Sequence, residues 1–437
     1  MSGSVNLLHA NDKIGQHAPS WYTDQVAAPP ARATLKGNRK ADICIIGGGF
    51  TGLSSALHLA KLGYSVIVVE AHRAGWGASG RNGGQVGSGQ RQDQDFLEKH
   101  YGLENAHAYW QIGEEAKAIV RSFIKDYNID CNAEDGIIHA DHRERYLAGS
   151  REYTDKLNQE YGYDKIQFLD HEALQSHIKS KAYFGGTLDT GAFHLNPLAL
   201  ALGIAKAAEN AGAEIFENSE VTEVIKGSCP RVKTSSGEIE CDYLIYACNG
   251  YLGGLDNQIA GKVLPINNFV LTTAPLDLAT RAKIMPTKAA IADSKFVVNY
   301  FRMTHDGRLL FGGGENYGYH FPKDIKEFVR KPMLEIFPEL KNTPIDYGWG
   351  GTLAITMKRL PLFERVSGNI LNCSGYSGHG VALACLAGKI AAETIQGQAS
   401  RFDLMAKLET PRFPGGTMLR YPMLVAAMIW FSLRDKL

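Results

Sequence analysis

The sequence lacks an excess of charge, paired cysteines and a membrane-length apolar run, and each absence removes a class of function. Lysine and arginine together number 46, as do aspartate and glutamate. The basic residues are scattered, so we do not expect the positive surface that nucleic acid requires. None of the seven cysteines lies in a CxxC pair, which predicts reduced thiols and no metal site. The N-terminus has no charged region followed by an apolar stretch, so we expect no signal peptide and a cytoplasmic protein.

One apolar segment near the C-terminus, residues 421–433, raises the question of a membrane. It is shorter than the ~20 residues that a spanning helix needs. Two alternatives stay open: the segment packs on the protein's own body, or it makes peripheral contact with a membrane surface such as the inner membrane. The oligomeric state is not indicated by the sequence.

A strand, a turn and a helix near the N-terminus give the first chemical signal. Residues 42–46 form a short continuous apolar run, which is typical of a strand buried on both faces. The motif Gly47-x-Gly49-x-x-Gly52 follows, then a helical apolar pattern that ends at Gly63. A second apolar strand over residues 65–69 ends in Glu70. These segments predict one strand–helix–strand unit.

This context predicts a dinucleotide site rather than a strand–helix turn without a ligand. Gly47 is expected to make the tight turn, Gly49 to let the pyrophosphate approach the backbone, and Gly52 to allow close helix–strand packing. The N-terminus of the helix offers N–H groups to the phosphates. Glu70 is expected to accept hydrogen bonds from the adenosine ribose. The predicted contacts in this unit are Gly47, Gly49, Phe50, Thr51, Gly52, Glu70 and Ala71.

Two further glycine-rich stretches decide between FAD and NAD, which share the first motif. Residues 75–85 suit an extended cofactor; as a mere flexible loop they would carry a large entropic cost. Residues 375–380 precede a predicted helix, whose dipole suits the N1–C2=O edge of a flavin, and the alternative is a simple N-cap loop. Together the three stretches predict FAD. The predicted contacts here are Gly77, Ala78, Ser79, Arg81, Asn82, Gly83, Gly84, Gly250, Gly375, Tyr376, Gly378, His379, Gly380 and Val381.

The order of predicted elements indicates an α/β chain, α+β overall, with two interleaved domains. Buried strands alternate with helices in three separated segments, which predict a Rossmann-like FAD-binding domain. Two insertions carry amphipathic helices and alternating strands, which predict a substrate domain with a mixed or antiparallel sheet. The predicted boundaries are 1–38 for an N-terminal arm, 39–91, 191–261 and 349–400 for the FAD-binding domain, 92–190 and 262–348 for the substrate domain, and 401–437 for a C-terminal extension.

These motifs resemble the D-amino-acid-oxidase-like superfamily of FAD-dependent oxidoreductases, and the resemblance covers residues 41–394. The dinucleotide motif combined with residues 77–85 (GASGRNGGQ) is specific for this group. Within it, residues 20–22, 300–313, 349–351 and 375–380 are similar to the bacterial gamma-glutamylputrescine oxidoreductases.

The resemblance implies oxidation of an amine C–N bond, with hydride passing from the substrate C–H to flavin N5 and the imine hydrolysed to aldehyde and ammonia. It further implies gamma-glutamylputrescine from putrescine catabolism as substrate, oxygen as acceptor and hydrogen peroxide as product. Val221 is expected to contact the adenine through its backbone. Residues 349–363 contain no cysteine, which implies non-covalent FAD. Residues 352–360 lack the acidic residue that many members keep before Pro361, a departure that bears on the substrate.

Four residues are candidates for the substrate side of the site, each with a plainer alternative. His379 either tunes the flavin or makes loop hydrogen bonds. Arg302 either binds a substrate carboxylate or forms a structural ion pair. Tyr300 and Trp349 either wall the pocket or pack in the core. The candidates for activating oxygen, which are otherwise surface residues, are Lys262, Lys295 and Lys358.

Other functions are compatible with much of this pattern. A D-amino-acid, glycine or sarcosine-type oxidase would use the same flavin chemistry. A membrane-associated dehydrogenase would pass electrons to quinone, which segment 421–433 would suit. A flavin-free binding protein of the same fold would have lost the glycines, and an NAD-linked dehydrogenase would be colourless.

Overall fold

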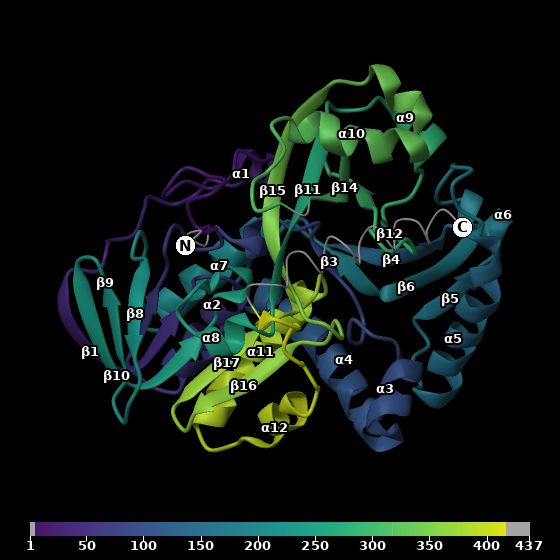
Figure 1. Cartoon of the computed structure of the whole chain (residues 1–437). Coiled ribbons are helices and arrows are strands. Elements are labelled where there is room, and N and C mark those ends of the chain that lie inside the picture. Colours follow the sequence, from purple (N-terminus) through teal and green to yellow (C-terminus); the bar gives the residue numbers. More distant parts are fainter. Residues whose placement is uncertain (1–4, 317, 417–437) are drawn as a thin grey trace.

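Residues 5–316 and 318–416 are described in a computed structural model of the chain, which contains two large sheets with helices packed on and around them (Figure 1). The first sheet has eight strands in the order β16-β17-β10-β1-β2-β7, and the β8–β9 hairpin is attached to β10. Neighbours from β17 to β7 run parallel, and β16 pairs antiparallel with β17. Its strands are β1 Gly37–Ile46, β2 Val66–Val69, β7 Glu214–Phe216, β8 Val221–Ile225, β9 Arg231–Thr234, β10 Gly237–Tyr246, β16 Leu362–Ser367 and β17 Ile370–Ser374.

The second sheet has nine strands in the order β15-β11-β14-β13-β12-β4-β6-β3, with β5 paired to β6. It is antiparallel except for the pairing of β12 with β4, in which Ala290 stands opposite Ile137. Its strands are β3 Gln85–Val86, β4 Glu134–Asp141, β5 Ile166–Leu169, β6 Gly185–His194, β11 Leu264–Thr273, β12 Ala290–Asp293, β13 Tyr300–Met303, β14 Leu309–Asn316 and β15 Ile345–Ile355.

The helices divide between these two sheets. Helix α2 packs against α7 and α11, and α11 also contacts α4, while α10 lies against β11, β14 and β15 of the second sheet (Figure 1). The helices are α1 Trp21–Gln25, α2 Phe50–Lys61, α3 Gln94–Tyr101, α4 Leu103–Asp126, α5 Leu147–Glu160, α6 His171–Gln175, α7 Pro197–Asn210, α8 Asn257–Ala260, α9 Leu278–Ile284, α10 Ile325–Ile336, α11 Gly380–Ile395 and α12 Ser400–Ala406.

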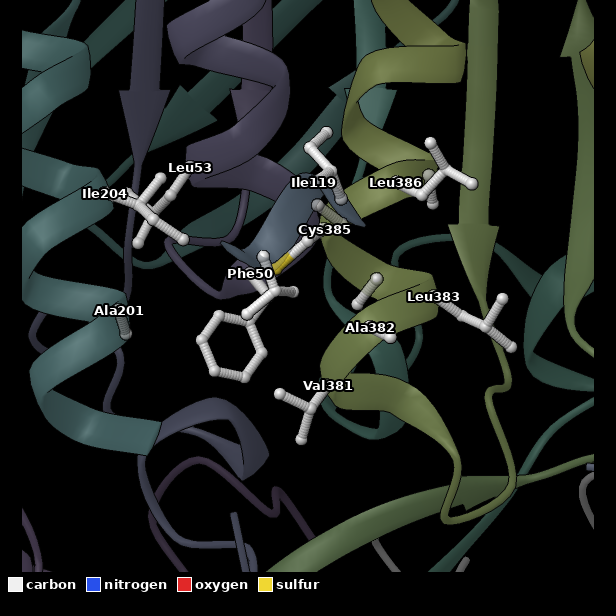
Figure 2. Packing of buried hydrophobic residues seen from close by; sticks show 14 of the residues in the cluster. Phe50, Leu53, Ile119, Ala201, Ile204, Val381, Ala382, Leu383, Cys385 and Leu386 are labelled. Carbon is white, nitrogen blue, oxygen red and sulfur yellow. The ribbon is translucent and has the colours of Figure 1, made fainter. Parts of the chain in front are cut away.

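Small residues let α2 and α11 approach closely, which fixes the start of both helices. Figure 2 shows Phe50 of α2 beside Cys385 of α11, and Leu53 of α2 beside Ile204 of α7, within one buried cluster. A Cβ added at Gly388 would lie 2.5 Å from the backbone nitrogen of Ser55, so only glycine fits there. The hydroxyl of Ser54 donates to the carbonyl of Cys385 at 2.6 Å. The two N-termini, both from glycine-rich turns, are thereby held side by side.

The predicted fold class is confirmed, and most predicted elements lie where the pattern placed them. The strand–helix–strand unit is β1, α2 and β2, and Gly63 has the positive φ of +89° expected just past a helix end. Strand β10 runs without a break from Gly237 to Tyr246, and β13 begins at Tyr300.

Within the described residues, no helix is both long enough and apolar enough to cross a membrane. The apolar segment 421–433 lies outside the described part of the chain. The first sheet takes its strands from three separated stretches, 37–69, 214–246 and 362–374, whereas the second sheet uses strands between residues 85 and 355.

Candidate cofactor and substrate site

Two adjoining cavities open where β1 and β2 end. The larger has a volume of ≈ 640 Å³ and the smaller ≈ 90 Å³, and both are lined by Gly49, Ala78 and Ser79. Ligands in open parallel sheets bind at this carboxyl edge. The predicted contacts that line one or both cavities are Gly47, Gly49, Phe50, Thr51, Glu70, Ala71, Gly77, Ala78, Ser79, Arg81, Asn82, Gly83, Val221, Tyr376, Gly378, His379, Gly380 and Val381.

The first glycine turn leaves room and amide groups for an anionic ligand. Gly47 has φ +110°, and a Cβ there would lie 2.7 Å from the carbonyl oxygen of Ala247. A Cβ at Gly52 would lie 1.9 Å from the carbonyl oxygen of Gly47. Helix α2 begins at Phe50 after Gly49, which has no capping side chain. Its N-terminus, where the Ser79 hydroxyl accepts from the N–H of Phe50, faces the cavities, and the positive end of its dipole suits a pyrophosphate.

The smaller cavity contains the residues expected at the adenosine end of the cofactor, and Leu8 of the N-terminal arm forms part of its wall. Glu70 lies in its wall and accepts hydrogen bonds from the N–H groups of Gly48 at 2.7 Å and His72 at 2.9 Å. Burial raises the pKa of Glu70 to about 7 despite these bonds. Val221 lies in the same wall, and Leu8 of the arm covers it.

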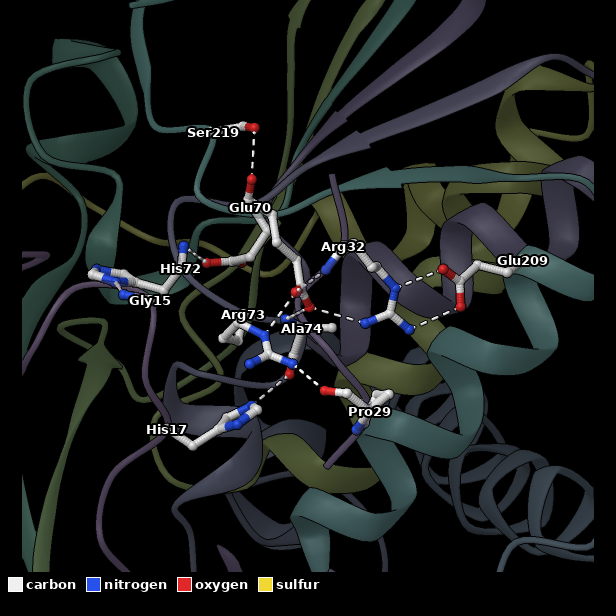
Figure 3. Close-up of polar contacts among 11 residues, drawn as sticks. Gly15, His17, Pro29, Arg32, Glu70, His72, Arg73, Ala74, Glu209 and Ser219 are labelled. Atoms are coloured by element: carbon white, nitrogen blue, oxygen red, sulfur yellow. Dashed lines mark hydrogen bonds and ion pairs between the residues drawn. The ribbon is translucent and has the colours of Figure 1, made fainter. Parts of the chain in front are cut away.

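Residues 5–36 form the arm, which is held to the cofactor edge by polar contacts (Figure 3). Glu217, whose side chain is fully buried, accepts from the backbone N–H groups of Arg32 and Ala74 and from the guanidinium groups of Arg32 and Arg73, all at 2.7–2.9 Å. On the exposed side, Arg32 also forms a bidentate pair with Glu209. The arm thus depends on one buried carboxylate for much of its anchoring.

The second glycine-rich stretch, residues 75–85, lines the cavities and also holds neighbouring segments in place by hydrogen bonds. The Ser79 hydroxyl accepts from the N–H of Phe50 at 2.9 Å, and Asn82 donates to the carbonyl of Ala78 at 2.9 Å. Arg81 pairs with Asp12 of the arm at 2.7 Å and lies 4.6 Å over the ring of Trp76. Its Nη2 is buried without a hydrogen-bond partner among the described residues, so it is available to a ligand in the cavity.

The third glycine cluster brings His379 against residues almost three hundred positions earlier. A Cβ at Gly87 would lie 2.8 Å from Cε1 of His379. Burial and the nearby Arg91 charge lower the pKa of His379 to about 4, so its ring is neutral at pH 7. The Tyr376 hydroxyl bonds that of Thr51 at 2.6 Å, joining the starts of α11 and α2.

Not every predicted residue reaches the cavities. Arg302 is buried behind the larger one and donates to the carbonyl oxygens of Gly83 at 3.2 Å and Leu195 at 3.0 Å. Trp349 is also buried and donates to the carbonyl oxygen of Arg81 at 2.9 Å. Tyr300 does line the cavity, and its hydroxyl donates to Asn268 at 2.5 Å. The predicted contacts that shape the turns without lining a cavity are Gly52, Gly84, Gly250 and Gly375.

None of the three candidate lysines lines either of these two cavities. Lys262 pairs with Glu364 at 2.9 Å, Lys295 with Glu335 at 3.6 Å and Lys358 with Glu409 at 2.5 Å. The larger cavity is instead lined by polar residues that pattern reasoning missed. Arg91 and Arg359 come from loops, Asp293 from the end of β12, and His139 and Asn268 from within β4 and β11.

The model of the family described as FAD dependent oxidoreductase (DAO) matches residues 42–394. The chain belongs to this family. Its larger cavity, its glycine turns and the N-terminus of α2 at the cavity wall fit FAD, the cofactor of the family. The alternatives of an NAD-linked dehydrogenase and of a flavin-free binding protein are set aside. This DAO-family chain is therefore an FAD-dependent oxidoreductase of the amine and amino-acid type.

Individual relatives of this DAO-family oxidoreductase cover nearly its full length. It is 40% identical over 95% of its length to a probable oxidoreductase, OrdL, of Rhizobium meliloti, covering 97% of that protein. It is 38% identical over 97% of its length to gamma-glutamylputrescine oxidoreductase of Escherichia coli, covering 99% of it. The crystal structure of glycine oxidase from Geobacillus kaustophilus superposes with a TM-score of 0.73 at 18% identity, covering 86% of this chain and all of that one. This last likeness concerns the fold.

Proposed function

We propose that this oxidoreductase converts the primary amine of gamma-glutamylputrescine to an aldehyde, with oxygen as electron acceptor. The observation that carries the proposal is the 38% identity with gamma-glutamylputrescine oxidoreductase of Escherichia coli across 97% of the chain. The larger cavity, of ≈ 640 Å³, supports it because a long, flexible amine needs room beyond the cofactor.

The overall reaction balances as R–CH₂–NH₂ + O₂ + H₂O → R–CHO + NH₃ + H₂O₂. FAD, when bound, supplies the two-electron acceptor that amine oxidation requires. The residues that would hold it are those of the three glycine stretches, with Glu70 and Val221 at the adenosine end. Cys373 is fully buried in β17, and in the described part of the chain no cysteine lines the larger cavity. We therefore propose a non-covalent cofactor.

The chain's own contribution is to favour the neutral amine, because an ammonium group cannot be oxidised in this way. Apolar side chains line much of the larger cavity, among them Leu264, Ile266 and Phe296, and burial away from water lowers the pKa of an amine. Burial lowers the pKa of His139, and that of His379 lies at about 4, so both rings act as neutral walls at pH 7.

The test is a visible spectrum of the purified protein followed by anaerobic mixing with gamma-glutamylputrescine, putrescine, sarcosine, glycine and D-alanine. Bleaching of the flavin band by gamma-glutamylputrescine alone is the expected result. Bleaching by glycine or D-alanine instead would assign the enzyme to amino-acid oxidation. Hydrogen peroxide formed in air, compared with quinone reduction in a membrane fraction, then separates an oxidase from a dehydrogenase.

A further inference from the structure

Arg91 is a cation in the wall of the larger cavity that has no partner among the residues the structure describes. It lies in the loop between β3 and α3 and lines that cavity. No hydrogen bond or ion pair to its guanidinium is found within residues 5–316 and 318–416. Burial, together with the charge of Arg359, lowers the pKa of Arg91 to about 10. Arg359, whose guanidinium packs 4.4 Å from the centre of the Phe296 ring, lines the same cavity.

Four other arginines near the two cavities each have partners, although Nη2 of Arg81 lacks one among the described residues. Arg32 and Arg73 pair with Glu217, Arg81 pairs with Asp12, and Arg302 donates to two carbonyl oxygens. Arg91 is half-buried, and a guanidinium partly withdrawn from water beside a second positive charge costs stability because nothing replaces its lost hydration. Such a group in a cavity is a mark of a binding site for an anion.

The acidic residue in this wall does not supply the missing charge partner. Asp293 accepts from Nδ2 of Asn299 at 2.8 Å, from the N–H of Asn299 at 2.9 Å, from the N–H of Lys295 at 3.3 Å and from the hydroxyl of Tyr183 at 3.3 Å. Both of its oxygens are therefore occupied by groups of the protein. The two histidines, His139 and His379, carry no charge at pH 7, so the wall as a whole attracts anions.

We propose that Arg91, together with Arg359, binds the carboxylate of the acyl part of the substrate, at a distance from the amine that is oxidised. A guanidinium fork matches the two oxygens of a carboxylate. The proposal rests on the proposed function, because gamma-glutamylputrescine carries an amine at one end and the glutamyl carboxylate at the other. It assigns to the loop after β3 the carboxylate role that the sequence had suggested for Arg302.

The experiment compares Arg91→Gln with wild type on two amines that share the same amide and amine. Gamma-glutamylputrescine has the carboxylate, and N-acetylputrescine lacks it. In Arg91→Gln we expect KM for gamma-glutamylputrescine to rise roughly 10- to 100-fold, the range for losing hydrogen bonds to a charged group. KM for N-acetylputrescine and kcat for both amines should stay within about threefold of wild type. Arg231→Gln, which removes an exposed arginine paired with Glu238, is the matched control.

Two outcomes would overturn the proposal. Equal losses on both amines would show that Arg91 does not distinguish the carboxylate. A fall in kcat with a shifted flavin spectrum, and unchanged KM, would place Arg91 at the cofactor instead. Thermal stability distinguishes a binding role for Arg91 from a structural one. Because Arg91 has no partner in the described chain, Arg91→Gln should keep or raise the Tm of the substrate-free holoenzyme. A clear fall in Tm would contradict the proposal.

A separate measurement keeps this proposal distinct from the proposed function. L-glutamine carries the same glutamyl carboxylate and γ-amide but lacks the reacting amine chain. L-glutamine should perturb the flavin absorbance of wild type. In Arg91→Gln, the Kd from this perturbation should rise by the same factor as the KM for gamma-glutamylputrescine. If no amine bleaches the flavin but L-glutamine binds in this way, the proposed function fails and the carboxylate site stands. If L-glutamine fails to bind wild type, the carboxylate site fails.

Discussion

Replacing Glu217 by glutamine should destabilise the protein far more than replacing Glu209, although both carboxylates pair with Arg32. The Glu217 side chain is fully buried and accepts from two backbone N–H groups and two guanidinium groups. Glutamine has one acceptor oxygen and turns an NH₂ group toward these donors, so two arginines lose their buried counter-charge. Breaking a buried ion pair from one side costs about 3–5 kcal/mol. We expect a loss of that size in the free energy of unfolding.

Glu209→Gln is the matched control, because the Glu209 side chain is 36% exposed. An exposed pair contributes about 1 kcal/mol or less. Thermal denaturation of both holoenzymes, followed by circular dichroism and by release of flavin fluorescence, measures the difference. Glu217→Gln should lower Tm by roughly 5–10 °C, since 1 kcal/mol corresponds to about 2 °C in a long chain. Equal Tm values for the two variants would refute the reasoning.

The same carboxylate gives a pH dependence with a definite sign. Burial alone would raise the pKa of Glu217, but the hydrogen bonds from Ala74 and Arg32 and the charges of Arg73 and Arg32 outweigh it and lower the pKa. A carboxylate with a lowered folded-state pKa stabilises the protein above the ordinary glutamate pKa of about 4.3 and loses this effect as pH falls further. The difference in stability between wild type and Glu217→Gln should therefore be full at pH 7 and shrink in acid.

Three shorter predictions concern the cavities. Gly83→Ala puts a Cβ 2.6 Å from the Tyr300 ring, so kcat/KM should fall at least about tenfold, whereas Gly149→Ala, with nothing within 4 Å, should leave it unchanged. His379→Asn should not alter the shape of the kcat profile between about pH 6 and 9, because the pKa of His379 is about 4; loss of an inflection there would contradict this. Asp12→Asn removes the partner of Arg81 and should raise the Kd for FAD about fivefold or more, measured by fluorescence titration of the apoprotein.

Local sequence patterns predicted the strand, turn and helix on the cofactor side of this molecule, because each of these elements is specified by residues that are close together in the chain. A continuous apolar strand, three spaced glycines and a helical pattern predict β1, the turn and α2 from about thirty residues. The second sheet was harder to predict from sequence, because pairs such as Ala290 with Ile137 join strands that are far apart in the chain. The spacing of residues in the sequence does not predict which residues of two such distant strands pair.

The substrate side was harder to predict for the same physical reason. Arg302 stands on a strand between apolar residues and looked like a ligand group, but backbone carbonyl oxygens hold its guanidinium. Arg91 and Arg359 lie in loops, where only tertiary packing decides that one guanidinium meets a carboxylate and another does not. The arm was recognised as a separate segment, but its contact with the smaller cavity depends on partners such as Glu217.

The arm also sets an order of events during protein synthesis. His9 of the arm bonds Glu220, which is made 211 residues later, and Asn11 donates to the carbonyl of Tyr319. At roughly 5–20 residues per second, the ribosome needs about 10–40 s to add the first of these partners. The glycine turn at residues 47–52 therefore leaves the ribosome well before these two contacts can form, whereas the bond of Leu8 with His72 and the pair of Asp12 with Arg81 join residues made much earlier. The anchoring of the arm is thus completed in stages as the chain is made.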